Sequence, residues 1–154
     1  MMDLILWRHA EAEEPREGDE DLQRPLTPRG EKQAARMAAW LDRQLPDGLR
    51  VLASPAVRTE ATAKALGRKY KLRAELLPGD TAADLLELVQ WPQARGAVLV
   101  VGHQPMLGQA AAELLGLRSP DCAIRKGAVW WLRRRARAEV AETILMAVQA
   151  PDFL

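Results

Sequence analysis

Asp3-Leu4-Ile5-Leu6-Trp7-Arg8-His9-Ala10 joins an apolar run of strand length to an arginine and a histidine. A short, bounded aliphatic run is typical of a buried strand. In an open α/β sheet, ligands bind beyond the carboxyl ends of the strands, so Arg8 and His9 lie where a site is expected. Arginine supplies a fixed fork of donors, and histidine supplies a nucleophile or a proton carrier. Taken alone, the pair fits a polar strand cap equally well.

The composition indicates a soluble globular chain and excludes several function classes. A length of 154 residues predicts a single domain, residues 1–154, with enough chain for a hydrophobic core. The formal net charge is +1, so no strong field draws the chain to nucleic acid or to a membrane surface. The run Leu4–Trp7 is too short for a secretory signal, and no basic segment precedes it. Cys122 is the only cysteine, which fits a reducing compartment. We therefore expect a cytoplasmic protein with no nucleic-acid or membrane partner.

The histidine count bears on metal chemistry. His9 and His103 are the only histidines, and one cysteine accompanies them. These residues are too few for a metal site rich in nitrogen or sulfur ligands. No Gly-rich phosphate loop of the Walker type is present either. We expect no metal and no other cofactor.

The rest of the chain alternates strand and helix patterns. Continuous apolar character over Ala97–Val101 predicts a central parallel strand that is buried on both faces. This alternation predicts an α/β fold of three layers, with a mostly parallel central sheet flanked by helices. Further strands are expected at 50–53 and 72–77. Helices are expected at 28–45, after Ser54-Pro55 with Ser54 as the cap, from a cap at Asp80 or Thr81 to Trp91-Pro92, and at 106–115.

Two segments depart from the alternation. Glu11–Asp21 is acidic, contains Pro and Gly and shows no apolar period, so we expect a solvated surface loop. Near the C-terminus, Ala128–Leu132 and Glu142–Val148 predict a strand hairpin on one side of the sheet. The basic run Arg133–Arg137 is expected to form its solvated turn, with a nucleic-acid patch as the alternative.

Polar groups follow three predicted strands at their carboxyl ends. Arg8-His9 ends the first strand, and Gly102-His103 ends the central one. Ser54-Pro55 ends another, and Arg58 falls in the first turn of the helix that follows. These groups suit phosphate chemistry: arginines orient a dianion, helix N-termini offer free N–H groups, and a neutral imidazole can attack phosphorus. The second imidazole, if cationic, would stabilise charge on the phosphoryl oxygens.

Four motifs, in this order, resemble the histidine phosphatase superfamily. The match covers the chain from the first strand to the last helix, and each motif lies at a predicted strand or helix end. The chain is similar to the small SixA-type phosphohistidine phosphatases, which implies a phosphoglycerate mutase-like sheet. The motifs are Arg8-His9-Ala10, Arg24-Pro25-Leu26-Thr27-x-x-Gly30, Ser54-Pro55-x-x-Arg58-Thr59-x-x-Thr62-Ala63 and Gly102-His103-x-Pro105.

The resemblance implies a role for each site residue. His9 resembles the catalytic nucleophile that becomes phosphorylated, and Arg8 and Arg58 resemble the catalytic arginines that hold the phosphoryl group. His103 resembles the second catalytic histidine, which lies in the phosphate pocket. Arg24 resembles a further phosphate contact of the small members.

The chain departs from the family pattern at two points. Ala10 stands where the family usually has glycine, which questions a positive φ or a close backbone approach there. The general acid of the larger branches also has no evident counterpart. Gln104 stands where one branch has an aspartate, and Glu75 and Asp80 are the only candidate acids in the region where another has a glutamate.

The resemblance implies a phosphatase that hydrolyses phosphohistidine in a protein, such as a histidine-containing phosphotransfer domain, and releases inorganic phosphate. Two alternatives stay open: a small-molecule phosphomonoesterase on the same scaffold, and a phosphoprotein-binding module without turnover. The complete set of Arg8, His9, Arg58 and His103 favours an enzyme over the module. A carboxylate aimed at the leaving group would favour the small-molecule alternative.

Overall fold

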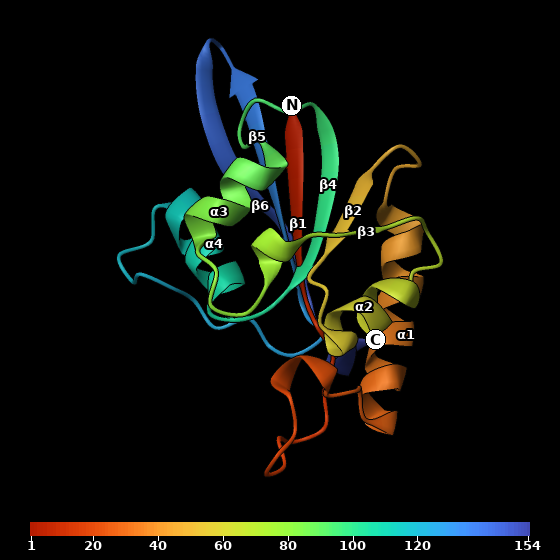
Figure 1. Ribbon diagram of the computed structural model, residues 1–154. Coiled ribbons are helices and arrows are strands. Elements are labelled where there is room, and N and C mark those ends of the chain that lie inside the picture. The colour runs from red at the N-terminus through yellow and green to blue at the C-terminus, as the bar shows by residue number, and fades with distance from the viewer.

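A mixed six-stranded sheet with the order β3-β2-β4-β1-β5-β6 forms the middle of the structure, a computed structural model that describes residues 1–154 (Figure 1). Strands β3, β2, β4 and β1 pair in parallel, and β5 pairs antiparallel with both β1 and β6. The strands are β1 (Met2–Arg8), β2 (Arg50–Ala53), β3 (Lys71–Leu72), β4 (Gly96–Gly102), β5 (Val129–Arg137) and β6 (Val140–Gln149).

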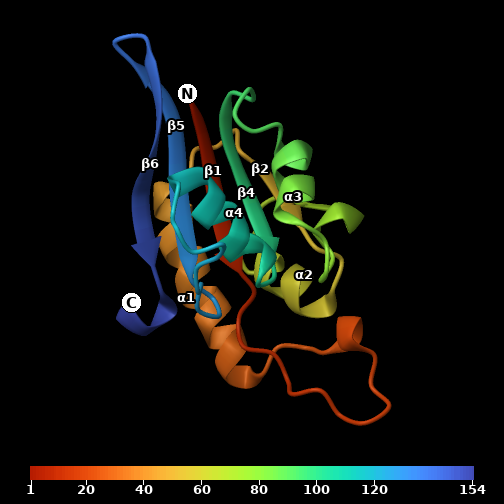
Figure 2. The same cartoon turned by 90° about the vertical axis from the view of Figure 1, so that its left-hand side faces the viewer.

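Helices cover both faces of this sheet. One pair, α1 (Pro28–Gln44) and α2 (Val57–Lys64), packs on one face, and α3 (Ala82–Val89) and α4 (Met106–Leu115) pack on the other, as Figures 1 and 2 show. The 3₁₀ turns η1 (Asp21–Gln23), η2 (Ala74–Leu76) and η3 (Pro151–Phe153) complete the elements. The predicted three-layer α/β fold with a mostly parallel sheet and a C-terminal hairpin is confirmed. No helix has the length and apolar character needed to cross a bilayer.

Strand β1 divides the core in two because its side chains alternate between the faces. Leu4 and Leu6 join the cluster under α3 and α4. Ile5 and Trp7 join the cluster under α1 and α2. All four are fully buried, and burial of each such side chain contributes about 1.5–3 kcal/mol. The carboxyl end of β1 is therefore held from both sides.

The segment before α1 is docked by its two ends. Thr27 caps α1 by accepting a hydrogen bond from Gly30 N (2.9 Å), with Pro28 at the first helical position, as predicted. Thr27 N donates to Glu11 O (3.0 Å), and Glu13 N donates to Pro25 O (2.8 Å). A Cβ at Gly30 would collide with the Glu11 carbonyl, so this approach requires glycine. The loop therefore leaves and rejoins the fold at one place.

The predicted basic turn Arg133–Arg137 is wrong, because these residues continue β5. The strand extends because acidic partners pair with the arginines: Arg133 with Asp3 and Arg135 with Glu142. The actual turn is Ala138-Glu139, and both residues have positive φ.

The structure also corrects one smaller prediction and decides between two alternatives in another. The expected strand 72–77 shrinks to Lys71–Leu72 followed by η2, because the helical turn carries Leu76 into the core under α3. The cap of α3 is Thr81 and not Asp80, since Thr81 forms a reciprocal capping box with Asp84.

Candidate active site

The two histidines meet where β1 and β4 end. Arg8 pairs with Gly102 in the parallel register, and His9 N donates to Gly102 O (3.1 Å). This alignment places the rings of His9 and His103 with centroids 5.5 Å apart and planes tilted by 57°. Both side chains are buried, at 7% and 3% exposure. The structure therefore brings together the two histidines that the sequence predicts at separate strand ends.

Two arginines flank the histidine pair. Arg58 lies in the first turn of α2 and is 3% exposed. Arg8 is half-buried and donates from Nη1 to Ile124 O (2.8 Å). Arg8 Nε, Arg58 Nε and His103 Nδ1 are buried without any hydrogen-bond partner. Native proteins rarely leave buried polar atoms unpaired, so three such nitrogens together indicate a site for an anion that accepts from them.

Burial keeps both imidazoles neutral. Desolvation, with the charges of Arg58, Arg8 and Lys126, lowers the pKa of His9 to about 4. Desolvation and Arg58 lower the pKa of His103 to about 3. Desolvation also lowers the pKa of Arg8. His103 is therefore a neutral group in this structure, and the cationic role that the sequence analysis considered for it would require protonation.

Hydrogen bonds fix how His9 can react. His9 Nδ1 lies 2.7 Å from Ala10 O, which can only accept, so Nδ1 carries the proton. Nε2 of the neutral ring then holds the free lone pair. The backbone supports this orientation, since Gly127 N donates to His9 O (3.0 Å).

Ser54 has a different role from the one predicted. The N-cap of α2 is Ala56, so Ser54 does not cap this helix. Its hydroxyl lies 2.8 Å from His103 Nε2 instead, and both groups are buried. If the hydroxyl donates to Nε2, Nδ1 of His103 carries the proton and points an unpaired donor into the site.

Ala10 fits its position without strain. It is fully buried, and its φ is not positive, so the backbone there does not require glycine. Ala10 N donates to Thr62 Oγ1 (3.1 Å), which in turn donates to Arg58 O (2.8 Å). Thr62 thereby links the end of β1 to the helix that carries Arg58.

The predicted phosphate contact Arg24 is already engaged. Arg24 donates from Nε and Nη2 to the Asp21 carboxylate (3.0 and 2.9 Å) and from Nη1 to Glu13 O (2.8 Å). Asp21 also accepts from Arg58. Arg24 therefore joins the site through Asp21, a residue that the sequence analysis placed in a solvated loop.

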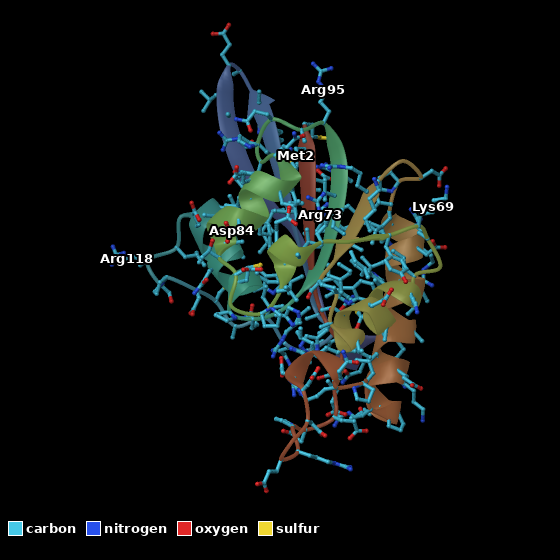
Figure 3. All side chains as sticks on the ribbon, viewed as in Figure 1. Met2, Lys69, Arg73, Asp84, Arg95 and Arg118 are labelled. Carbon is cyan, nitrogen blue, oxygen red and sulfur yellow. The ribbon has the colours of Figure 1, made fainter.

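Neither candidate acid forms a hydrogen bond with a histidine. Glu75 is paired with Arg73 (2.6 Å). The hydrogen bond from Arg73 lowers the pKa of the Glu75 carboxyl, although desolvation and the nearby Asp84 act to raise it. Figure 3 labels Arg73, which directly precedes η2, and Asp84, which lies in α3. The Asp80 side chain makes no hydrogen bond. No group of three or more His, Cys, Asp or Glu residues has a metal-binding arrangement.

Two supports of the site escaped the sequence analysis. The segment 124–128 holds Arg8 and His9 through main-chain groups, with Arg8 N donating to Ala128 O (3.0 Å). Main-chain partners leave no motif, so no sequence pattern could have revealed them. Asp21 could have been found, because it precedes Arg24 by three residues, a spacing at which opposite charges pair within one turn.

The buried guanidinium and imidazole nitrogens at the carboxyl edge of the parallel strands define a protein of the α/β class with a site suited to a phosphate-like anion. Comparisons with known proteins give the family. Residues 4–79 match the Histidine phosphatase superfamily (branch 1). The Phosphohistidine phosphatase SixA homolog of Haemophilus influenzae is 31% identical over 134 residues, covering 77% of this chain and 80% of that protein.

Two further relatives agree. Phosphohistidine phosphatase SixA of Escherichia coli is 35% identical over 127 residues, covering 77% of this chain and 78% of its own. The solved structure of the protein histidine phosphatase SixA complexed with tungstate has a TM-score of 0.76 at 27% identity and covers 99% of both chains. The chain therefore belongs to the histidine phosphatase superfamily.

Proposed function

We propose that this protein hydrolyses phosphohistidine in a partner protein, such as a histidine-containing phosphotransfer domain, through a covalent phosphohistidine on His9. The observation that carries the proposal is the hydrogen bond from His9 Nδ1 to Ala10 O, which leaves the Nε2 lone pair free to attack. The names of the two relatives and the tungstate bound to a third support an oxyanion substrate of this kind.

The flanking groups hold the phosphoryl oxygens in this proposal. Arg8 Nε, Arg58 Nε and His103 Nδ1 are the buried nitrogens without partners, and each can donate to one phosphoryl oxygen. Charged donors in a dry site stabilise the charge of the transition state without reorganisation. Neutral His103 acts here as a hydrogen-bond donor oriented by Ser54.

The reaction proceeds in two displacements. His9 Nε2 attacks phosphorus, and the bond from phosphorus to the substrate imidazole breaks, with the leaving nitrogen taking a proton from water. Water then attacks the phosphorus on His9, releases inorganic phosphate and restores the free imidazole. Each step breaks a P–N bond, the first forming the P–N bond to His9 and the second the P–O bond to water, so no alkoxide has to leave.

The nucleophile is tested by trapping the intermediate. After reaction with a ³²P-phosphohistidine protein and quenching without acid, peptide mapping should find the label on His9. His9→Ala should lower kcat/KM by about 10⁴-fold or more, as removal of a nucleophile does in other enzymes. Label on His103 alone, or full activity in His9→Ala, would contradict the proposal.

The substrate class is tested by leaving groups. A positioned acid typically contributes about 10²–10⁴-fold to expulsion of a poor leaving group. Of the two candidate acids, Glu75 is already paired with Arg73. We expect kcat/KM for a phosphohistidine protein to exceed that for an alkyl phosphate by at least about 10². Asp80→Asn should change the phosphohistidine rate only slightly. Similar rates on both substrates, with loss of the alkyl phosphate rate in Asp80→Asn, would favour a small-molecule phosphomonoesterase.

A further inference from the structure

The Asp21 carboxylate contacts Arg58, which the proposed function assigns to the phosphoryl group, and Arg24, which the sequence resemblance suggests as a further phosphate contact. Its Oδ2 accepts from Arg58 Nη2 (3.0 Å), and its main-chain oxygen accepts from Arg58 Nη1 (2.8 Å). Its Oδ1 accepts from Nε and Nη2 of Arg24 (3.0 and 2.9 Å). Both terminal nitrogens of Arg58 are thus occupied by one residue of the loop.

This contact joins a surface residue to a buried one. The side chain of Arg58 is 4% exposed, whereas that of Asp21 is 53% exposed. Asp21 begins the single turn η1 within the loop that extends beyond the carboxyl end of the sheet (Figure 2). The hydrogen bonds of Glu13 with Pro25 and of Thr27 with Glu11 hold the base of the loop. Asp21 can therefore leave Arg58 without disturbing the sheet.

Asp21 is an anion in this position. Desolvation acts to raise the pKa of its carboxyl, but hydrogen bonds from Arg24 and Arg58 outweigh it and lower the pKa. The carboxylate presents one negative charge to two guanidinium groups. The buried nitrogens Arg8 Nε and His103 Nδ1 have no partner while it is there.

We propose that Asp21 is a specificity-determining residue whose carboxylate occupies Arg58 and Arg24 until a dianionic phosphoryl group displaces it. The inference rests on the proposed function, because it takes Arg58 as a phosphoryl ligand. A phosphoryl dianion brings two charges and also reaches the unpartnered nitrogens, so it gains more from the site than Asp21 does. A monoanion such as a carboxylate or a phosphodiester brings no more charge than Asp21. The pocket therefore selects phosphoramidates and phosphomonoesters by charge.

Anion binding to the intact chain tests this without turnover. Dissociation constants of inorganic phosphate and of acetate would be measured by calorimetry for the wild type, Asp21→Ala and Asp21→Asn. Asp19→Asn is the matched control, since it removes the same charge from an exposed residue of the loop, whereas the hydrogen bonds of Arg58 go to Asp21. We expect the dissociation constant of acetate to be at least about 10-fold lower for Asp21→Ala than for the wild type. Phosphate should bind both Asp21 variants more tightly, and Asp19→Asn should stay within about twofold.

The opposite results identify other roles. Weaker phosphate binding in both Asp21 variants would show that Asp21 holds Arg58 in place, and the inference would be wrong. Unchanged binding of both anions would also overturn it. Each of these two results with the Asp21 variants would leave the proposed function intact, provided that the wild type binds phosphate and Arg58→Ala does not. If the wild type and Arg58→Ala bind phosphate equally, the proposed function fails first.

Discussion

The carboxyl edge of the parallel strands and the β5–β6 hairpin are both rich in arginine, but they treat it in opposite ways. At the parallel edge, Arg8 Nε and Arg58 Nε are buried with no partner. On the hairpin, Arg133 pairs with Asp3, and Arg135 pairs with Glu142. The hairpin arginines are satisfied within the fold. The arginines of the parallel edge each have a buried N–H donor without an acceptor in the chain, which an anionic ligand could supply.

The difference teaches that a basic residue indicates a site through its burial and its partners more than through its charge. A guanidinium nitrogen that is desolvated and unpaired destabilises the fold. Such a group persists at a functional edge, where an anion can complete its hydrogen bonds. The densest basic run in the sequence, Arg133–Arg137, carries none of these unpaired nitrogens.

Exchanging arginine for alanine in each region should sharpen the comparison most. Arg58→Ala should weaken binding of inorganic phosphate by roughly 2–5 kcal/mol, the usual effect of truncating one partner of a buried charged pair. Arg134→Ala should leave it unchanged, since Arg134 donates to Thr143 and pairs in register with Met2, at the far end of β1 from His9. Calorimetry on both variants measures this. Equal effects would mean that the pocket is misplaced.

Acid should destabilise the parallel edge through its histidines. The pKa of folded His9 is about 4 and that of His103 about 3, against about 6.5 in an unfolded chain. Between these pH values the unfolded chain binds more protons than the folded one. The stabilisation that comes from keeping both histidines neutral is therefore complete above about pH 6.5, and the free energy of unfolding falls as the pH drops below it. At pH 5 the loss is about 2 kcal/mol for each histidine.

Denaturant titrations at pH 7.5 and pH 5 check this difference. His103→Gln should lose about 2 kcal/mol less than the wild type over this range, because one titrating group is gone. Arg134→Ala on the hairpin should keep the wild-type pH dependence. A pH dependence in His103→Gln equal to that of the wild type would show that His103 is not a buried neutral group.

The parallel half was predictable because local patterns and tertiary packing agree there. The run Ala97–Val101 predicted a strand buried on both sides, and β4 has all of these residues buried. Thr27-Pro28 predicted the start of α1, and Gly116, with φ of 65°, ends α4 as expected. Parallel strands end at one edge of a sheet. The sequence alone therefore indicates that Arg8, His9 and His103 lie at the same edge.

What could not be predicted depends on partners far apart in sequence. Ser54 appears to local rules as a helix cap, but its partner, His103, lies 49 positions away. Local rules predict Arg133 as a turn residue, but it lies in β5 and pairs with Asp3, 130 positions away. The spacing of Asp21 and Arg24 indicates their pairing, but nothing local indicates that Asp21 also reaches Arg58, 37 positions away. Propensity rules describe neighbours in sequence and carry no information on such contacts.

The smallest expected effect comes from one substitution made in both regions. At the end of β1, Ala10 has no positive φ and is fully buried. Ala10→Gly adds freedom to the unfolded chain, which costs about 0.4–1 kcal/mol, and removes a buried methyl group, which costs about 0.8 kcal/mol more. At the tip of the hairpin, Ala138 has a φ of 49°, a conformation that disfavours a Cβ by about 1–2 kcal/mol. Ala138→Gly should therefore stabilise the protein by up to about 1 kcal/mol after its entropic loss.

Thermal unfolding of the two variants beside the wild type gives the signs, and phosphatase rates should stay within about twofold in both, because neither change alters a donor or the His9 ring. A rate increase of about tenfold or more in Ala10→Gly would show that the methyl group at this position limits the site, as the glycine usual in the family suggests. Destabilisation in Ala138→Gly equal to that in Ala10→Gly would show that the hairpin turn does not hold the positive φ that separates the two regions.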